Sequence, residues 1–334
     1  MTGPRVVEVA DLVKVYPGGT RAVDGITFGV AAGEFFGFLG PNGAGKTTTI
    51  KILATLLRPT SGVARVAGLD VTAHPADVRR RVGFAMQTVA LDQLATGREN
   101  LELIGRLHRM RGPELCRRVD ELLELMNLAE VAKKLVATYS GGMRRRLDLA
   151  SALVHQPEVL FLDEPTEGLD PQSRTALWEE LLRINRAGTT MFLTTHYMEE
   201  ADRLCGRLAI IDAGRIAVEG SPADLKRSIG ADTVALQLSA DDAAAFAAAQ
   251  DDVARLLDGF APLSGLERTP LGVSLAVTDA EGAIPDLLRR LDGNGVRVSG
   301  LSMSQPSLDD VFLRYTGRRI RDEDADRPVI LGWF

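Results

Sequence analysis

GPNGAGKTT, residues 40–48, follows directly on the apolar run EFFGFL. The pattern G-x-x-x-x-G-K-[ST] is satisfied by Gly40, Gly45, Lys46 and Thr47. Glycines let backbone amides approach phosphate oxygens, and a helix that begins near Lys46 points its positive dipole end at the same place. The lysine then reaches the β and γ phosphates, and the threonine hydroxyl binds Mg²⁺. The stretch therefore predicts a nucleoside triphosphate site (the P-loop) rather than an ordinary glycine turn.

A second motif supplies the carboxylates that such a site needs. VLFLDEP, residues 159–165, is an apolar strand that ends in Asp163 and Glu164. A buried parallel strand should end at a ligand-facing edge of its sheet. We expect Asp163 to order Mg²⁺ and Glu164 to orient and deprotonate the attacking water.

The pattern of strand-like and helical segments changes near residue 220. Before it, strand-like runs alternate with helical patterns, which is typical of βαβ units on a parallel sheet. Residues 92–157 interrupt this rhythm with a mostly helical block. RLAIIDAGRIAVEG, residues 207–220, predicts two strands joined at a Gly214 turn.

The remainder predicts a smaller α+β domain. Strand-like and helical segments follow one another in a βαββαβ-like order, with strands expected at 232–239, 271–279 and 296–303, helices at 241–259 and 283–295, and a closing helix capped by Ser307. We therefore expect an α/β nucleotide-binding domain over residues 1–220, with a helical subdomain at about 88–158, then an α+β domain over 221–318 and a tail over 319–334.

Composition excludes several classes of protein. The net charge of −6 argues against general duplex binding, so no nucleic-acid partner is expected. Two cysteines, Cys116 and Cys205, give neither a disulfide framework nor a metal-ligand spacing, and both are expected to be packing residues. The sequence shows no signal peptide and no run of about 18 apolar residues, so neither secretion nor a membrane span is expected.

From Tyr139 to Asp170 the chain resembles the ATP-binding cassette (ABC) proteins. The stretch YSGGMRRRLDLASALVHQPEVLFLDEPTEGLD looks like the signature, Walker B and D-loop region of that family. The family's signature is usually LSGGQ, and Met143 here replaces its glutamine. The resemblance covers residues 5 to about 220 and implies a P-loop ABC ATPase domain.

The resemblance also assigns roles residue by residue. Glu164, His196 and Gln87 match the catalytic base, the switch histidine and the Q-loop glutamine. Thr47, Gln87 and Asp163 match the positions that meet Mg²⁺. The positions that match nucleotide contacts, in the same copy or in a partner copy, are Tyr16, Gly40, Pro41, Asn42, Gly43, Ala44, Gly45, Lys46, Thr47, Thr48, Ser140, Gly141, Gly142 and Asp170.

The family's geometry implies that two copies sandwich two ATP molecules head to tail. The signature of one copy then covers the nucleotide of the other, and hydrolysis at Glu164 releases the pair. A separate membrane permease would dock near Gln87 and the helical block, which places the chain on the cytoplasmic face of the cell membrane. Two alternatives stay open: a soluble ABC machine that acts on DNA or ribosomes, and a P-loop kinase or GTPase.

Three further stretches are similar to the ATPases of daunorubicin and doxorubicin resistance exporters. These are MQTVALDQLATGRENLELIGRLHRM, SGGMRRRLDLA and SQPSLDDVFLRYTGRRIRDE. The similarity implies a homodimer that powers efflux of a hydrophobic antibiotic-like compound bound by the permease. ATPases of lipid and polysaccharide exporters resemble this type too. The C-terminal domain is expected to be either a stabilising or dimer-contact module or a regulatory one.

Overall fold

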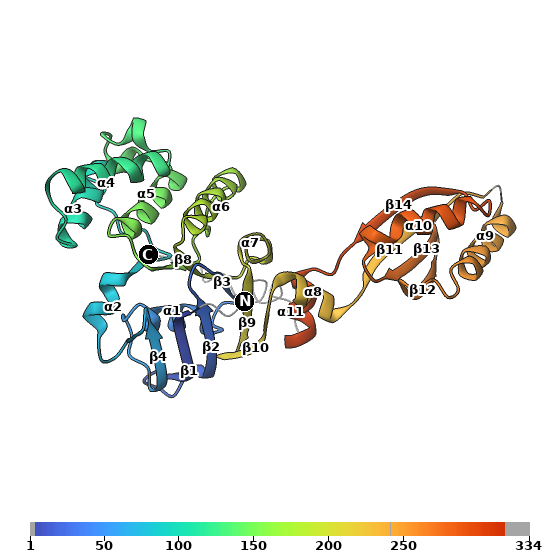
Figure 1. Ribbon diagram of the computed structural model, residues 1–334, viewed down its shortest axis with the longest axis horizontal. Helices are drawn as coiled ribbons and strands as arrows, with labels where there is room; N and C mark the ends of the chain where they lie inside the picture. The colour runs from blue at the N-terminus through green and yellow to red at the C-terminus, as the bar shows by residue number, and fades with distance from the viewer. Residues whose placement is uncertain (1–3, 241, 318–334) are drawn as a thin grey trace, which may run out of the picture. The chain divides into compact units, whose positions relative to one another are not determined.

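The computed structural model describes residues 4–240 and 242–317 of the 334-residue chain. These residues form two compact units that meet in sequence at Pro222 and Ala223 (Figure 1). The predicted tail over 319–334 lies outside the described residues. Within the described ranges, no helix is both long and apolar enough to cross a membrane.

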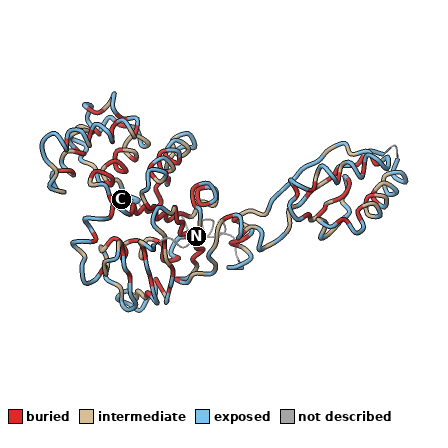
Figure 2. Tube along the Cα trace, viewed as in Figure 1, coloured by how far each residue is buried: buried red, intermediate tan, exposed pale blue. Residues whose placement is uncertain are grey.

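A six-stranded sheet forms the centre of the first unit. Its order is β10-β9-β3-β8-β7-β6, and all neighbours are parallel except β10 and β9. Every residue of β3, β7 and β8 is buried, as the apolar runs predict (Figure 2). The strands are β3 (Phe35–Leu39), β6 (Val82–Ala85), β7 (Val159–Asp163), β8 (Thr190–Thr195), β9 (Arg207–Asp212) and β10 (Arg215–Gly220).

A second, antiparallel sheet was not predicted. Its order is β2-β1-β4-β5, with β1 (Arg5–Val15), β2 (Arg21–Ala31), β4 (Ser61–Val66) and β5 (Leu69–Asp70). Phe28 of β2 packs on Phe36, Phe38 and Phe192 of the central sheet, with ring centroids 5.4–5.9 Å apart. The βαβ units expected from the sequence belong to the central sheet, and no strands were named from the sequence in this second sheet, where all neighbouring strands are antiparallel.

Helices cover the central sheet and form the predicted helical block. Among them α3, α4 and α5 pack on one another, and α5 also contacts β6 and α6 (Figure 1). The helices are α1 (Lys46–Leu53), α2 (Pro75–Arg81), α3 (Gly97–Leu107), α4 (Gly112–Leu125), α5 (Gly141–Leu153), α6 (Pro171–Arg186) and α7 (Met198–Leu204), with short 3-10 turns at Ala129–Val131 and Val136–Thr138.

The second unit has the βαββαβ order. Its antiparallel sheet runs β12-β13-β11-β14, and α9 and α10 contact it to close a core that includes Val234, Leu275 and Leu287. The elements are β11 (Asp232–Leu238), α9 (Ala243–Leu256), β12 (Leu263–Thr269), β13 (Gly272–Val277), α10 (Ala280–Asp292) and β14 (Val298–Ser304), flanked by α8 (Pro222–Ile229) and α11 (Leu308–Thr316). No strand was expected at β12, because this edge strand carries only partly buried or exposed residues.

Two local predictions had different outcomes. Ser307 caps α11, because its side chain accepts from the Asp310 amide and the Asp310 carboxylate returns a bond to the Ser307 amide. Cys205 is buried, but Cys116 is exposed, so the prediction of a packing role was wrong for Cys116. The apolar face of α4 is formed by buried Leu115, Val119, Leu122 and Leu123, and Cys116 lies at the edge of this face.

Candidate functional site

Three loops meet where adjacent central strands end. The P-loop follows β3, Asp163 ends β7 with Glu164 directly after it, and His196 follows β8. Because β8 pairs with both β3 and β7, the carboxyl ends of these parallel strands lie side by side. Ligands of open α/β sheets bind at such strand ends.

Two glycines of the P-loop, Gly40 and Gly45, are required by close backbone contacts. A Cβ on Gly40 would lie 2.2 Å from the Ile211 carbonyl oxygen. Gly45 has φ +105, and a Cβ there would lie 2.3 Å from the Ala22 carbonyl oxygen. Helix α1 begins at Lys46, immediately after this turn, so its first amides face the loop.

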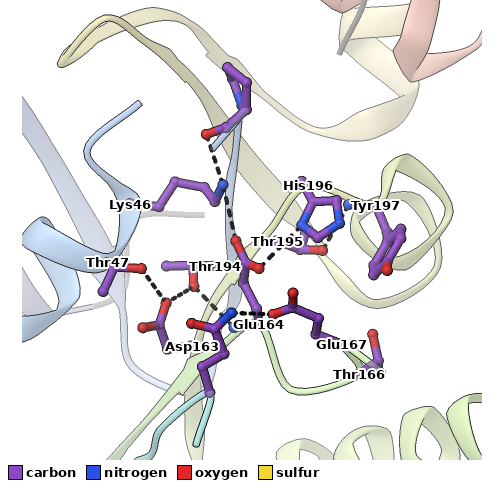
Figure 3. A network of polar contacts seen from close by, with 12 residues as sticks. Lys46, Thr47, Asp163, Glu164, Thr166, Glu167, Thr194, Thr195, His196 and Tyr197 are labelled. Carbon is purple, nitrogen blue, oxygen red and sulfur yellow. Dashed lines mark hydrogen bonds and ion pairs between the residues drawn. The ribbon is translucent and has the colours of Figure 1, made fainter. Parts of the chain in front are cut away.

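Lys46 points back across the loop toward a carboxylate. Its ammonium, on a residue only 4% exposed, donates to Gly40 O at 2.7 Å and Pro41 O at 3.0 Å. It also lies 3.2 Å from Glu164 Oε1 (Figure 3). The structure therefore brings together the P-loop cation and the predicted base.

Glu164 is held between two basic groups. His196 Nδ1 lies 3.2 Å from Glu164 Oε2, on the side away from Lys46 (Figure 3). Burial raises the pKa of Glu164, but His196 and Lys46 outweigh it and lower that pKa to about 2. Glu164 is thus ionised at neutral pH, as a proton acceptor must be.

The backbone of Glu164 lies in the left-handed region, with φ +47. Its amide donates to Thr194 O at 3.0 Å, and Thr194 Oγ1 lies 3.2 Å from the same nitrogen. A residue without glycine's freedom keeps such a conformation only where its surroundings impose it, and such positions cluster at functional sites.

The residues predicted to meet Mg²⁺ are only partly brought together. Thr47 Oγ1 donates to Asp163 Oδ1 at 3.1 Å, and Thr194 Oγ1 donates to the same oxygen at 2.6 Å (Figure 3). A hydroxyl beside a carboxylate fits Mg²⁺, which takes few protein oxygens plus water and substrate phosphates. Gln87 instead donates to Glu167, an exposed carboxylate on the turn after β7.

Tyr16, one of the positions predicted to contact the nucleotide, lies at the edge of the P-loop. Tyr16 is 36% exposed, and its hydroxyl is 3.3 Å from Thr48 Oγ1. The ammonium of Lys14 lies 5.5 Å from the Tyr16 ring centroid. An exposed ring beside the P-loop is available for stacking.

The signature turn, residues 139–143, is placed elsewhere. Ser140 caps α5 by accepting from the Met143 amide at 3.2 Å. Asp170 caps α6 by accepting from the Ser173 amide and hydroxyl, at 2.9 and 2.6 Å. A Cβ on Gly142 would lie 2.8 Å from Ser173 Oγ, so the two helix starts adjoin. For Ser140 and Asp170, these bonds stay within their own helices.

Sequence reasoning missed two residues in or near the site, Thr194 and Glu200. Thr194 bonds Asp163 and Glu164, and its signal was a pair of threonines ending an apolar strand. Glu200, fully buried on α7, accepts from Thr166 Oγ1 at 2.9 Å and Trp178 Nε1 at 3.0 Å. Burial raises the pKa of Glu200 although these donors oppose it. In the sequence, nothing distinguishes Glu200 from the other charged residues of its helix.

Comparison with known proteins gives the same assignment. The ABC transporter family model matches residues 23–167, and the C-terminal domain model of DrrA1-3-like ATP-binding proteins matches residues 220–316. The chain is 45% identical over 308 residues to the daunorubicin resistance ATP-binding protein DrrA2 of Streptomyces coeruleorubidus, covering 92% of this chain and 94% of that protein.

Two further matches complete the picture. The chain is 43% identical to the Nod factor export ATP-binding protein I of Paraburkholderia xenovorans, covering 93% of this chain and 97% of that protein. A solved dimeric structure of the ATP-binding cassette MJ0796, bound to ADP and Pi, matches 64% of this chain and 98% of its own, with 28% identity and a TM-score of 0.59. The chain belongs to the ABC transporter ATP-binding proteins and is an ABC-type ATPase.

Proposed function

We propose that this protein is the ATP-hydrolysing subunit of an exporter and powers efflux of a hydrophobic, drug-like compound through a separate permease. The observation that carries the proposal is the convergence of Lys46, Glu164 and His196 at three adjacent strand ends. Relatives named for daunorubicin resistance, similar over almost the whole chain, support the cargo class.

In the proposed reaction the P-loop amides and Lys46 hold the triphosphate. Glu164, ionised and backed by His196, accepts a proton from the attacking water. Thr47 and Asp163 would hold Mg²⁺, whose charge offsets that of the phosphate oxygens. Tyr16 stacks on the adenine, and the Thr194 hydroxyl fixes the Asp163 carboxylate by donating to its Oδ1.

The proposed working unit is a homodimer on the cytoplasmic face of the membrane. Ser140, Gly141 and Gly142 of one copy then cover the nucleotide of the other, while Asp170 faces the partner copy. The dimeric cassette structure supports this arrangement for a protein of the same fold. Exposed leucines of the helical block, Leu94, Leu103 and Leu107, offer apolar contacts to a permease near Gln87.

A second cargo class has support from the relatives named for Nod factor export. The two are separated by expressing the protein with its genomic permease in a drug-sensitive bacterium. Efflux of doxorubicin that requires the permease, and that Glu164→Gln abolishes, supports drug export. Unchanged doxorubicin accumulation in cells whose membranes show ATPase activity dependent on Glu164 contradicts it.

A further inference from the structure

Arg145 is buried against the backbone of Asp163 and Glu164, although it belongs to α5, the helix that begins at the signature turn. It stands on α5, five residues after Ser140, and is only 5% exposed. Arginine is almost never buried unless its donors are satisfied by partners. The partners of Arg145 therefore identify what its burial serves.

One edge of the guanidinium binds the backbone that carries the base. Arg145 Nε donates to Pro165 O at 2.6 Å. Nη2 lies 3.4 Å from the carbonyl oxygens of both Asp163 and Glu164. One rigid fork thus reaches three consecutive carbonyls, and a residue with φ +47 sits in the middle of them.

The other edge binds the loop that carries Gln87. Nη1 donates to Met86 O, the carbonyl just before Gln87, and lies 3.3 Å from Asp148 Oδ2. Asp148 is also buried, 8% exposed, and accepts from the amide of Ala90. The pair therefore holds the Gln87 loop on both sides of the glutamine.

Two buried opposite charges with these partners make a rigid junction. A buried ion pair gives weak evidence for stability, because desolvation offsets the attraction. It gives stronger evidence for geometry here, because the planar guanidinium on α5 binds two separate backbone segments at once, residues 163–165 and Met86. A shift of α5 at Ser140 would move the carbonyl of Glu164 with it.

We propose that Arg145, paired with Asp148, is a positioning residue that couples the signature helix and the Gln87 loop to the placement of Glu164. It acts on the chemical step through Glu164 and does not contact nucleotide. The inference rests on the proposed function, in which Glu164 is the base. Misplacement of a reacting group by about 1 Å can slow a reaction about 100-fold.

The test compares steady-state ATP hydrolysis by Arg145→Lys with that of wild type and of Arg146→Lys. Lysine keeps the positive charge beside Asp148 but replaces the planar guanidinium by a single ammonium group, which cannot reach all of these carbonyls at once. We expect kcat to fall about 10-fold or more while KM changes less than about 3-fold. Arg146 stands next on the same helix and donates to the Met126 carbonyl at 3.0 Å, so its variant should match wild type in kcat.

A double variant guards against a folding defect. Arg145→Gln with Asp148→Asn removes both buried charges, so its melting temperature should stay closer to wild type than that of Arg145→Gln alone, while kcat stays low. If Arg145→Lys or the double variant is folded and its kcat is within about 2-fold of the wild-type value, the positioning inference is wrong, while the proposed function is unaffected. ATPase activity that survives Glu164→Gln removes the proposed base, and the inference falls with it.

Discussion

The ammonium of Lys46 and the carboxylate of Glu164 form a buried ion pair, 3.2 Å apart, between the P-loop and the end of β7. The cation that the motif assigns to phosphate is therefore also the partner of the proposed base. A bound phosphate would compete with Glu164 for this ammonium. Nucleotide binding is therefore expected to release the Glu164 carboxylate from its ion pair with Lys46.

Lys46→Ala should weaken nucleotide binding about 10-fold or more, since a hydrogen bond to a charged group contributes about 1.5–3 kcal/mol. Titration with a fluorescent ATP analogue measures the Kd. Lys51→Ala, on the same helix, is the matched control. Equal affinity of Lys46→Ala and wild type would contradict the P-loop assignment.

Glu164→Gln should bind ATP normally but lose hydrolysis by about 100-fold or more, because an amide accepts no proton from water. With turnover blocked, size-exclusion chromatography should show an ATP-dependent dimer. Glu199→Gln changes an exposed carboxylate in the first turn of α7 and should remain active. Phosphate release at the wild-type rate by Glu164→Gln would exclude this residue as the base.

Ser140→Asp separates the capping role of Ser140 from its proposed contact with the partner's nucleotide. Asp caps helices about as well as Ser, so the melting temperature should change little. Its carboxylate would repel a triphosphate, so the ATP-dependent dimer of a Glu164→Gln background should disappear. Ser140→Asn keeps the cap without the charge, and a dimer unaffected by either change would remove the signature turn from the interface.

Tyr16→Ala should weaken ATP affinity, because base–aromatic stacking contributes about 1–3 kcal/mol. Tyr16→Phe loses the hydroxyl contact with Thr48 but keeps the ring, so its Kd should stay near that of wild type. Isothermal titration with ATP distinguishes the two variants. Equal losses in both would assign the effect to the hydroxyl instead.

Asp148 predicts a pH dependence of stability. Burial raises its pKa from 3.8 to about 6, although Arg145 opposes this. Between these pH values the folded chain binds more protons than the unfolded chain, so the contribution of Asp148 to stability is lost as pH rises. The Asp148→Asn variant cannot bind this proton, so its stability lacks this dependence on pH.

The free energy of unfolding of Asp148→Asn, relative to wild type, should therefore increase from about pH 5 to about pH 7.5. Urea denaturation at the two pH values measures it. Asp120→Asn, which removes an exposed carboxylate paired with Arg98, is the control. A difference that stays constant between these pH values would show that Asp148 does not titrate there.

Motifs confined to a few residues were readable from the sequence. The order of Gly40, Gly45, Lys46 and Thr47 specifies a turn, a charge and a hydroxyl within one loop, because neighbouring residues stay neighbours in any fold. The apolar strand before Asp163 likewise predicted a buried strand ending in carboxylates, and β7 has that form. Ser307 likewise predicted the start of α11, because a helix cap involves only residues close together in the sequence.

Tertiary structure alone decided which of these local features meet. The pairing of β8 with β3 and β7 sets His196 and Lys46 on either side of Glu164. The pairing of β3 with β8 joins residues more than 150 positions apart, such as Phe35 and Met191, and no local periodicity records such a contact. The burial of Arg145 shows the same limit, since three arginines in a row look alike until packing selects the one that reaches the backbone of Glu164.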